Sequence, residues 1–108
     1  MKLTYPTALV LEALSNGYHH GFDVMDATGL PSGTVYPVLR RLEQEGLVRS
    51  RWEKAEQAQR EGRPPRRYYE LLGDAKPWLE AARERYRVLA AAVPRPARRL
   101  VPAKGGLS

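Results

Sequence analysis

The stretch that most constrains the fold of this chain is residues 29–52, GLPSGTVYPVLRRLEQEGLVRSRW. Apolar residues recur there at i, i+3, i+4 and i+7, the spacing of one buried helical face, at Val35, Val38, Leu39 and Leu42. Ser32 is expected to cap this helix with its hydroxyl. Gly46 is expected to end it, because glycine accepts the left-handed conformation found after a helix. The helix is followed by an extended run, residues 47–52, that predicts a β-strand.

The other side of this helix carries Gly33, Tyr36, Pro37 and Arg40, and we expect it to face solvent or a partner. Pro37 has no backbone N–H, so it leaves the Gly33 carbonyl without its helical partner and is expected to loosen the first turn. An apolar inner face, an outer face with tyrosine and arginine, and a following strand together predict a recognition helix that leads into a wing.

Two shorter helices are predicted before residue 29. Thr4 is expected to cap the first, whose inner face consists of Leu9, Val10, Ala13 and Leu14. Phe22 and Met25 are expected to anchor the second, which ends near Thr28. A Gly-containing turn joins this second helix to the recognition helix, and such a pair is typical of a helix-turn-helix.

The wing is predicted as two antiparallel strands, residues 47–53 and 67–72, joined by a long polar loop. Near its end the loop contains two adjacent prolines, which favour an extended and stiffened backbone. This backbone is expected to hold Arg63 and Arg66 apart, where they can reach adjacent phosphates or a minor groove. The alternative is an ordinary solvated loop.

The net charge of +6 is concentrated in two segments. Residues 49–67 carry seven basic and three acidic side chains, and residues 95–108 carry four basic side chains and no acidic one. Such confinement of positive charge indicates a surface that binds a polyanion. A solvated loop with a basic terminus is the alternative explanation of the same pattern.

A last helix is predicted from Asp74, its expected cap, to about Val93. It carries an apolar stripe that consists of Trp78, Leu79, Ala82, Tyr86, Leu89, Ala90 and Val93. The stripe can pack on its own domain or on a second copy of the chain. We favour a homodimer interface, because three short helices and a hairpin leave little room for all of these side chains.

The predicted fold class is mainly α with a small β-hairpin: a winged helix-turn-helix followed by a long C-terminal dimerisation helix. We expect the winged helix-turn-helix in residues 1–73, the dimerisation helix in residues 74–94 and a disordered basic tail in residues 95–108. A chain of 108 residues accommodates one such domain.

Several other classes of protein are disfavoured. The chain has no Cys, and its adjacent His19 and His20 lack the clustered ligands of a metal site. It has neither a catalytic triad motif nor a phosphate-binding glycine loop, so we expect no enzymatic activity and no cofactor. No apolar run approaches the roughly 18 residues that span a bilayer. We therefore expect a soluble cytoplasmic protein without a membrane partner.

The chain resembles the PadR family of bacterial transcriptional regulators, and in particular its small subfamily with a single C-terminal helix. The resemblance covers about residues 7–72. It is carried by the segments HGFDV at 20–24, GLPSGTVYPVLRRL at 29–42, EGLV at 45–48, WE at 52–53, GRP at 62–64 and RYY at 67–69. The chain departs from many relatives after the second strand, where Leu71-Leu72-Gly73-Asp74 replaces a Leu-Thr-x-x-Gly sequence.

The resemblance implies a winged helix, a dimer built by the C-terminal helix, and binding to an inverted-repeat operator in double-stranded DNA, usually as a repressor. On the recognition helix the expected DNA-binding residues are Ser32, Gly33, Thr34, Tyr36, Pro37, Arg40 and Arg41. On the wing they are Arg63, Pro64 and Arg66. The alternative function is a winged-helix module whose basic loop engages an acidic protein. The exposed Tyr36 and Arg40 favour DNA binding, because a protein-docking face would more often carry aliphatic residues at these positions.

The resemblance also suggests an effector, because some small relatives hold flat aromatic compounds at the dimer interface. Trp78 and Tyr86 lie about two helical turns apart with the small Ala82 between them. Two rings around a small residue can leave a pocket for a small planar aromatic effector. A closed interface, filled by side chains of the partner, is the default expectation.

Overall fold

The structure of the chain, a computed structural model, describes residues 1–96. Its elements are α1 (Tyr5–Ser15), α2 (Gly21–Thr28), α3 (Ser32–Gln44), β1 (Val48–Trp52), α4 (Ala55–Arg60), β2 (Arg67–Leu71), the 3-10 turn η1 (Gly73–Ala75), α5 (Lys76–Arg85) and α6 (Leu89–Ala92). The two strands form one antiparallel hairpin. The prediction of a mainly α fold with a small β-hairpin is confirmed. Within the described residues, no helix is long and apolar enough to cross a membrane.

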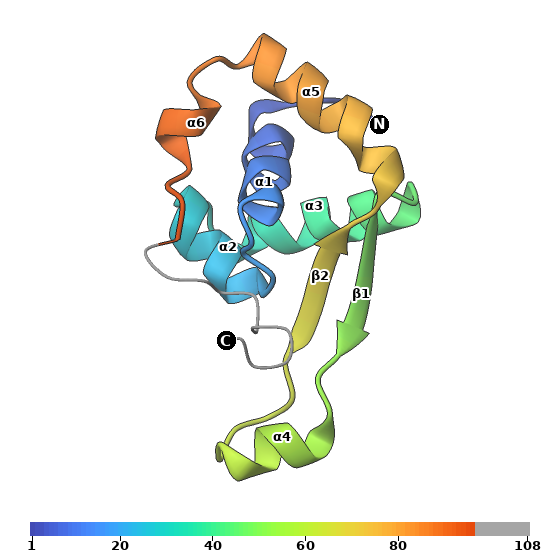
Figure 1. Cartoon of the computed structure of the whole chain (residues 1–108), viewed down its shortest axis with the longest axis vertical. Coiled ribbons are helices and arrows are strands. Elements are labelled where there is room, and N and C mark those ends of the chain that lie inside the picture. The colour runs from blue at the N-terminus through green and yellow to red at the C-terminus, as the bar shows by residue number, and fades with distance from the viewer. Residues whose placement is uncertain (97–108) are drawn as a thin grey trace.

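Helix α1 lies at the centre of the fold. It contacts α2, α3, α5, α6 and β2, and in Figure 1 α5 lies above it, α6 to its left, and α2 and α3 below. Every residue of α1 from Thr7 to Leu14 is buried, not only the predicted inner face. The burial is wider than predicted because the C-terminal helices cover the side of α1 that α2 and α3 leave open.

The start of α1 follows the prediction, whereas the start of α3 does not. The Thr4 hydroxyl oxygen accepts a hydrogen bond from the Thr7 N–H at 3.3 Å. The prediction that Ser32 caps α3 is wrong, because the cap residue is Pro31, whose backbone is extended and whose carbonyl accepts from the N–H groups of Thr34 and Val35. Ser32 is therefore already the first helical residue.

The rest of α3 agrees with the predicted pattern. Its four inward apolar residues are buried in the core. Pro37 lies inside the helix without ending it. After the helix Gly46 has a φ of 76°, the left-handed conformation that was expected there. The hydrophobic period thus predicted both the inner face and the end of this helix.

The prediction that Phe22 anchors α2 is wrong, because its side chain is 67% exposed. The helix begins at Gly21, and its phase turns Gly21, Val24 and Ala27 inward. Met25 is partly buried against the core, in agreement with its predicted role. Phe22 follows the first inward residue by one position, and this places its ring on the outer side.

The hairpin has the predicted strands and an additional helix. Val48 pairs with Leu71 at one end of the ladder and Trp52 pairs with Arg67 at the other. The prediction of an irregular loop between the strands is wrong in its first half, where α4 forms at the end of the hairpin far from the other helices (Figure 1). Ala58 of α4 is buried, which gives this tip a small packed interior.

The prediction of one continuous helix from Asp74 to Val93 is also wrong. Asp74 lies in η1 and does not cap α5, and the helical path breaks at Tyr86, whose φ and ψ are −121° and 83°. The break turns α6 back onto the domain, where Leu89 and Val93 are buried. Two long-range hydrogen bonds fasten this end of the chain: Asn16 Nδ2 donates to the Val93 carbonyl at 3.4 Å, and the Tyr18 hydroxyl donates to the Pro94 carbonyl at 2.7 Å.

The predicted apolar stripe is accordingly divided. Ala82, Leu89 and Val93 are buried within their own chain, and Ala90 is exposed. Trp78, Leu79 and Tyr86 are partly buried against the core. Packing on its own domain, the alternative to a dimer interface, therefore accounts for part of the stripe. Most of the predicted disordered tail, residues 97–108, lies outside the described residues.

Candidate nucleic-acid interface

The outer face of α3 is open to solvent. Six of its seven predicted DNA-binding residues are exposed and Thr34 is half-buried; the six are Ser32, Gly33, Tyr36, Pro37, Arg40 and Arg41. Arg40 and Arg41 form no ion pair with the described residues. The predicted exposure of this face is thus confirmed, and its contact with DNA stays a prediction.

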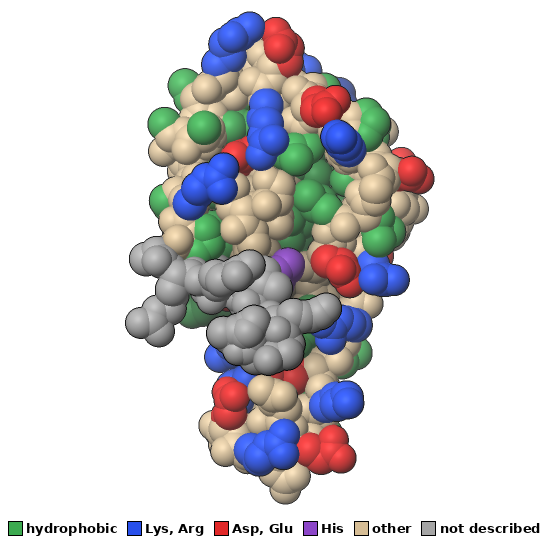
Figure 2. All heavy atoms as spheres, in the orientation of Figure 1, with side chains coloured by type: hydrophobic (Ala, Val, Ile, Leu, Met, Phe, Trp, Pro, Cys, Tyr) green, Lys and Arg blue, Asp and Glu red, His purple; other side chains and the backbone are tan. Residues whose placement is uncertain are grey.

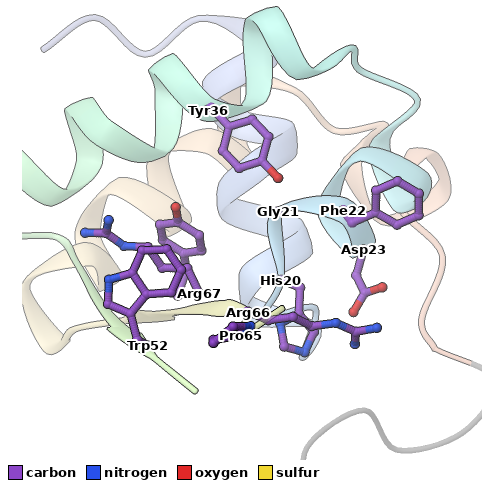
Figure 3. Close-up of a pocket in the computed structure, with 10 residues that line it drawn as sticks. His20, Gly21, Phe22, Asp23, Tyr36, Trp52, Pro65, Arg66 and Arg67 are labelled. Carbon is purple, nitrogen blue, oxygen red and sulfur yellow. The ribbon is translucent and has the colours of Figure 1, made fainter. Parts of the chain in front are cut away.

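Tyr36 is held against the backbone of α2. A Cβ atom added to Gly21 would lie 2.5 Å from both Cε1 and the hydroxyl oxygen of Tyr36. In Figure 3 the Tyr36 ring points from α3 toward Gly21. Only a residue without a side chain permits this approach. The sequence analysis included Gly21 only in the HGFDV segment of the family resemblance and missed its role beneath Tyr36.

A cleft of about 490 Å³ separates α3 and the start of α2 from the hairpin. Its lining combines aromatic, basic and acidic side chains and consists of His20, Gly21, Phe22, Asp23, Tyr36, Trp52, Pro65, Arg66, Arg67 and Tyr69. Figure 3 shows Tyr36 above the cleft and Arg66 below it. The cleft is therefore lined on one side by the outer face of α3 and on the other by the base of the wing.

His20 connects the start of α2 to the hairpin. Its ring centroid lies 4.4 Å from that of Tyr68, and its backbone forms an isolated antiparallel bridge with the same residue. Burial lowers the pKa of His20, and nearby Arg66 also lowers it, while Asp23 opposes the shift. The imidazole is thus neutral near pH 7, as a packing residue rather than a cation. Its buried Nδ1 has no hydrogen-bond partner among the described residues.

The basic residues of the hairpin fall into two groups. Arg49 pairs with Glu70 at 2.9 Å, Arg67 with Glu43 at 3.7 Å and Arg63 with Glu53 at 2.6 Å. Four others are exposed and form no ion pair in the described part of the chain: Arg51, Lys54, Arg60 and Arg66. At the tip, basic and acidic side chains are interspersed (Figure 2). The unpaired cations are therefore the ones available to an anionic partner.

Arg63, a predicted wing contact, differs from Arg66 in its surroundings. Its guanidinium donates to both carboxylate oxygens of Glu53, at 2.6 and 2.8 Å, and to Glu61 at 2.9 Å. Only 20% of its side chain is exposed. The sequence analysis missed this pairing, although Glu53 and Arg63 both belong to the segments that carried the family resemblance.

These features together define a class of protein. Three helices, a hairpin packed beside the third, and an exposed tyrosine and arginine face on that third helix form a winged helix-turn-helix, the architecture of DNA-binding domains. The family model described as "Transcriptional regulator PadR-like family" matches residues 10–74, more than half of the chain. The chain belongs to the PadR-like family of transcriptional regulators.

Solved structures agree with this assignment. One is a PadR family transcription regulator from hypervirulent Clostridium difficile R20291, with 22% identity, a TM-score of 0.66, and coverage of 82% of this chain and 93% of that chain. Another is a PadR family transcriptional regulator from Eggerthella lenta DSM 2243, with 27% identity, a TM-score of 0.57, and coverage of 77% of this chain and 75% of that chain. A search of curated proteins found no match.

Proposed function

We propose that the protein is a homodimeric repressor that binds an inverted-repeat DNA operator. The observation that carries this proposal is the exposed Tyr36 and Arg40 face of α3, whose Tyr36 shares a cleft with Arg66, an unpaired cation of the wing. Tyr36 and Arg66 line the same cleft, and Arg40 is exposed on α3 one turn after Tyr36. One duplex can therefore contact both surfaces.

Within this complex, α3 enters the major groove. Arg40 is placed to donate to the N7 and O6 acceptors of a guanine, the commonest specific contact between a side chain and a base. Tyr36 and Pro37 lie one turn nearer the start of α3, and Arg41 borders the same face. At the start of the helix, Ser32, Gly33 and Thr34 approach the DNA backbone. The N–H groups of Ser32 and Gly33 are free within the described residues, and free N–H groups at a helix N-terminus favour phosphate oxygens.

The wing supplies phosphate contacts. Arg66 and Pro64, which the family resemblance implies as wing contacts, are exposed between α4 and β2. Arg51, Lys54 and Arg60 add three unpaired cations. Such contacts fix the register of the protein on DNA and carry little sequence information. Arg63 is not proposed as a phosphate contact, because its guanidinium is already bound to two carboxylates.

The dimer interface is proposed to lie on the outer side of α5. Trp78, Leu79 and Tyr86 are only partly buried within one chain, and Val88, two residues after Tyr86, is exposed. A second copy would remove these apolar surfaces from water. Residues 74–94 would then act as the dimerisation segment of a winged helix-turn-helix formed by residues 1–73.

The effector pocket remains a proposal with a closed interface as its default. Within one chain the Tyr86 ring already packs on Tyr5, with 5.1 Å between ring centroids, and its hydroxyl donates to the Leu3 carbonyl at 3.4 Å. A planar aromatic compound bound beside Trp78 would quench or shift its fluorescence saturably. Unchanged fluorescence and unchanged operator affinity across a panel of phenolic compounds would indicate a closed interface.

The experiment that tests the function uses fluorescence anisotropy with two duplexes, one selected from a random pool by the protein and one random. Arg40→Ala is expected to cost roughly 1–3 kcal/mol on the selected duplex and much less on the random one. Arg66→Ala is expected to weaken both and to lower the slope of log K against log salt by about one. Equal losses on both duplexes for Arg40→Ala would exclude base reading by Arg40.

A second measurement tests the assembly. Light scattering at micromolar concentration is expected to give the mass of a dimer for the full chain. A monomer would exclude the two-fold operator. Absence of binding to any duplex at low salt would exclude a DNA-binding regulator and favour the alternative of an acidic protein partner.

A further inference from the structure

The Glu53 carboxylate occupies the point where β1 ends and the wing tip begins. It is buried and is surrounded by hydrogen-bond donors. Arg63 donates to it through Nη1 at 2.6 Å and Nη2 at 2.8 Å, the Arg66 N–H at 3.2 Å and the Tyr68 hydroxyl at 3.4 Å. In return, the Glu53 N–H donates to the Arg66 carbonyl at 2.7 Å. One side chain thus ties together both strands and the loop between them.

Arg63 joins this carboxylate to the wing tip. Its backbone N–H donates to the carbonyl of Ala58 in α4 at 3.1 Å, and its guanidinium also binds Glu61 at 2.9 Å. Arg66, only three residues later, is exposed and has no carboxylate partner in the described residues. The two arginines therefore point to different surroundings: Arg63 faces the interior of the wing and Arg66 faces solvent.

The charges of this pair are strongly stabilised. The Arg63 hydrogen bonds lower the pKa of Glu53 to about 2, although its burial alone would raise the pKa. The same hydrogen bonds raise the pKa of Arg63. Both groups consequently stay charged at any pH at which the protein would work, and the contact persists as a charge-assisted, bidentate pair.

We propose that Glu53 and Arg63 are positioning residues that set the wing against DNA without contacting DNA themselves. Glu53 fixes the backbone of Arg66 and, through Arg63, the orientation of α4. The unpaired cations of the wing are then presented in one arrangement, and less ordering is required on binding. This inference rests on the proposed function for its effect on DNA, but the effect on wing order can be measured without DNA.

The effect of Glu53→Gln on DNA affinity has opposite signs under the two explanations. Removal of an acidic charge near a polyanion strengthens binding if electrostatics alone decides. Loss of the pair weakens binding if Glu53 positions the wing. We expect the DNA affinity to fall about tenfold, the effect of displacing several wing cations moderately from their phosphate contacts. Glu56→Gln is the matched control, because Glu56 is exposed on α4 and forms no ion pair within residues 1–96. This control should bind as tightly as the original chain or more tightly.

A double-mutant cycle separates an indirect role of Arg63 from a direct one. If Arg63 acts through Glu53, Arg63→Gln and Glu53→Gln should each weaken binding, and the double variant should be no weaker than the worse single variant. If Arg63 touches phosphate, Arg63→Gln should still cost affinity in the Glu53→Gln background. Additive losses would therefore overturn the indirect role.

Wing order is measured on the free protein by trypsin cleavage. Because Pro64 follows Arg63, trypsin has no cleavable site there, so neither Glu53→Gln nor Arg63→Gln removes a site. We expect both variants to be cut after Arg60 and Arg66 at least about fivefold faster, since cleavage reports local opening of the segment. The Arg66 amide should also exchange its hydrogen faster in Glu53→Gln, because this amide donates to the carboxylate.

Thermal unfolding of each variant tests whether the rest of the domain remains folded. Unchanged cleavage and exchange, or Glu53→Gln binding DNA as tightly as the original chain, would overturn the positioning role. If the original chain binds no DNA but the variants are cut faster, the proposed function fails while the effect of the pair on wing order stands.

Discussion

Replacement of Gly21 by alanine tests how Tyr36 is placed on α3. The added methyl group would lie 2.5–2.6 Å from three atoms of the Tyr36 side chain: Cε1, Cζ and the hydroxyl oxygen. Ordinary van der Waals contact for such an atom begins at 3.4 Å. The ring must therefore retreat by about 0.9 Å or rotate away from α2, because the methyl group sits on backbone that cannot yield.

The free energy of this clash is limited by the exposure of Tyr36. An overpacked site in a closed core costs about 1–3 kcal/mol. The Tyr36 side chain is 39% exposed and can swing outward, so we expect a stability loss of at most about 1 kcal/mol. Alanine also favours the helix over glycine by up to about 1 kcal/mol, which offsets part of that loss. The main consequence is a displaced Tyr36 ring on the face proposed to read DNA.

The assay compares operator affinity and urea unfolding for Gly21→Ala in two backgrounds. With Tyr36 present, we expect operator affinity to fall by about 1 kcal/mol or more, while the free energy of unfolding changes little. In a Tyr36→Ala background the methyl group meets no ring, so Gly21→Ala should be silent in both measurements. Gly73→Ala is the matched control, because a Cβ atom there has nothing within 4 Å. An equal loss of affinity in both backgrounds would refute the role of the Tyr36 contact.

Three further changes test the core and its charges. Leu39→Ala, at a fully buried position of α3, should lower the free energy of unfolding by about 2–5 kcal/mol in urea titrations. Arg83→Met removes the partner of the buried Glu12 carboxylate, which Arg83 contacts at 2.8 Å. Because Arg83 is 48% exposed, water limits the loss in the free energy of unfolding to about 1–2 kcal/mol, and a variant as stable as the original chain would exclude a structural role for the pair. The His20 ring should titrate below pH 6.5 in NMR spectra, because burial lowers its pKa. As the pH drops through 6.5 the unfolded chain is protonated at His20 before the folded chain, so the free energy of unfolding should fall.

The parts of the fold that the sequence predicted are those decided by local pattern. The inner face of α3 follows from the helical period, and the end of α3 follows from Gly46, whose positive φ the structure confirms. The two strands were recognised by their composition and by the polar segment between them. Each of these signals lies within a few residues of the feature it predicts.

The parts that were wrong depend on contacts between distant segments. The apolar stripe after residue 74 indicates which residues avoid water but does not say which surface covers them. In the structure the helix breaks at Tyr86, α6 with Leu89 packs on α1, and Asn16 at the end of α1 donates to the Val93 carbonyl. The role of Arg63 was likewise hidden, since its partner Glu53 lies ten residues away across α4. Charge counting assigned Arg63 to the exposed surface because it treats every arginine as free.

The candidate interface is thus arranged by residues that do not lie on it. The turn before α2 packs against the hairpin: the Tyr69 N–H donates to the His19 carbonyl at 2.8 Å, and His19 Nδ1 donates to the Tyr69 carbonyl at 3.0 Å. Two residues later the same segment supplies Gly21 beneath Tyr36. Because one short stretch of backbone contacts both the hairpin and α3, it sets the spacing between them. A duplex that contacts both surfaces must fit this spacing, so we expect substitutions in the turn before α2 that shift the hairpin to weaken DNA binding without removing a contact.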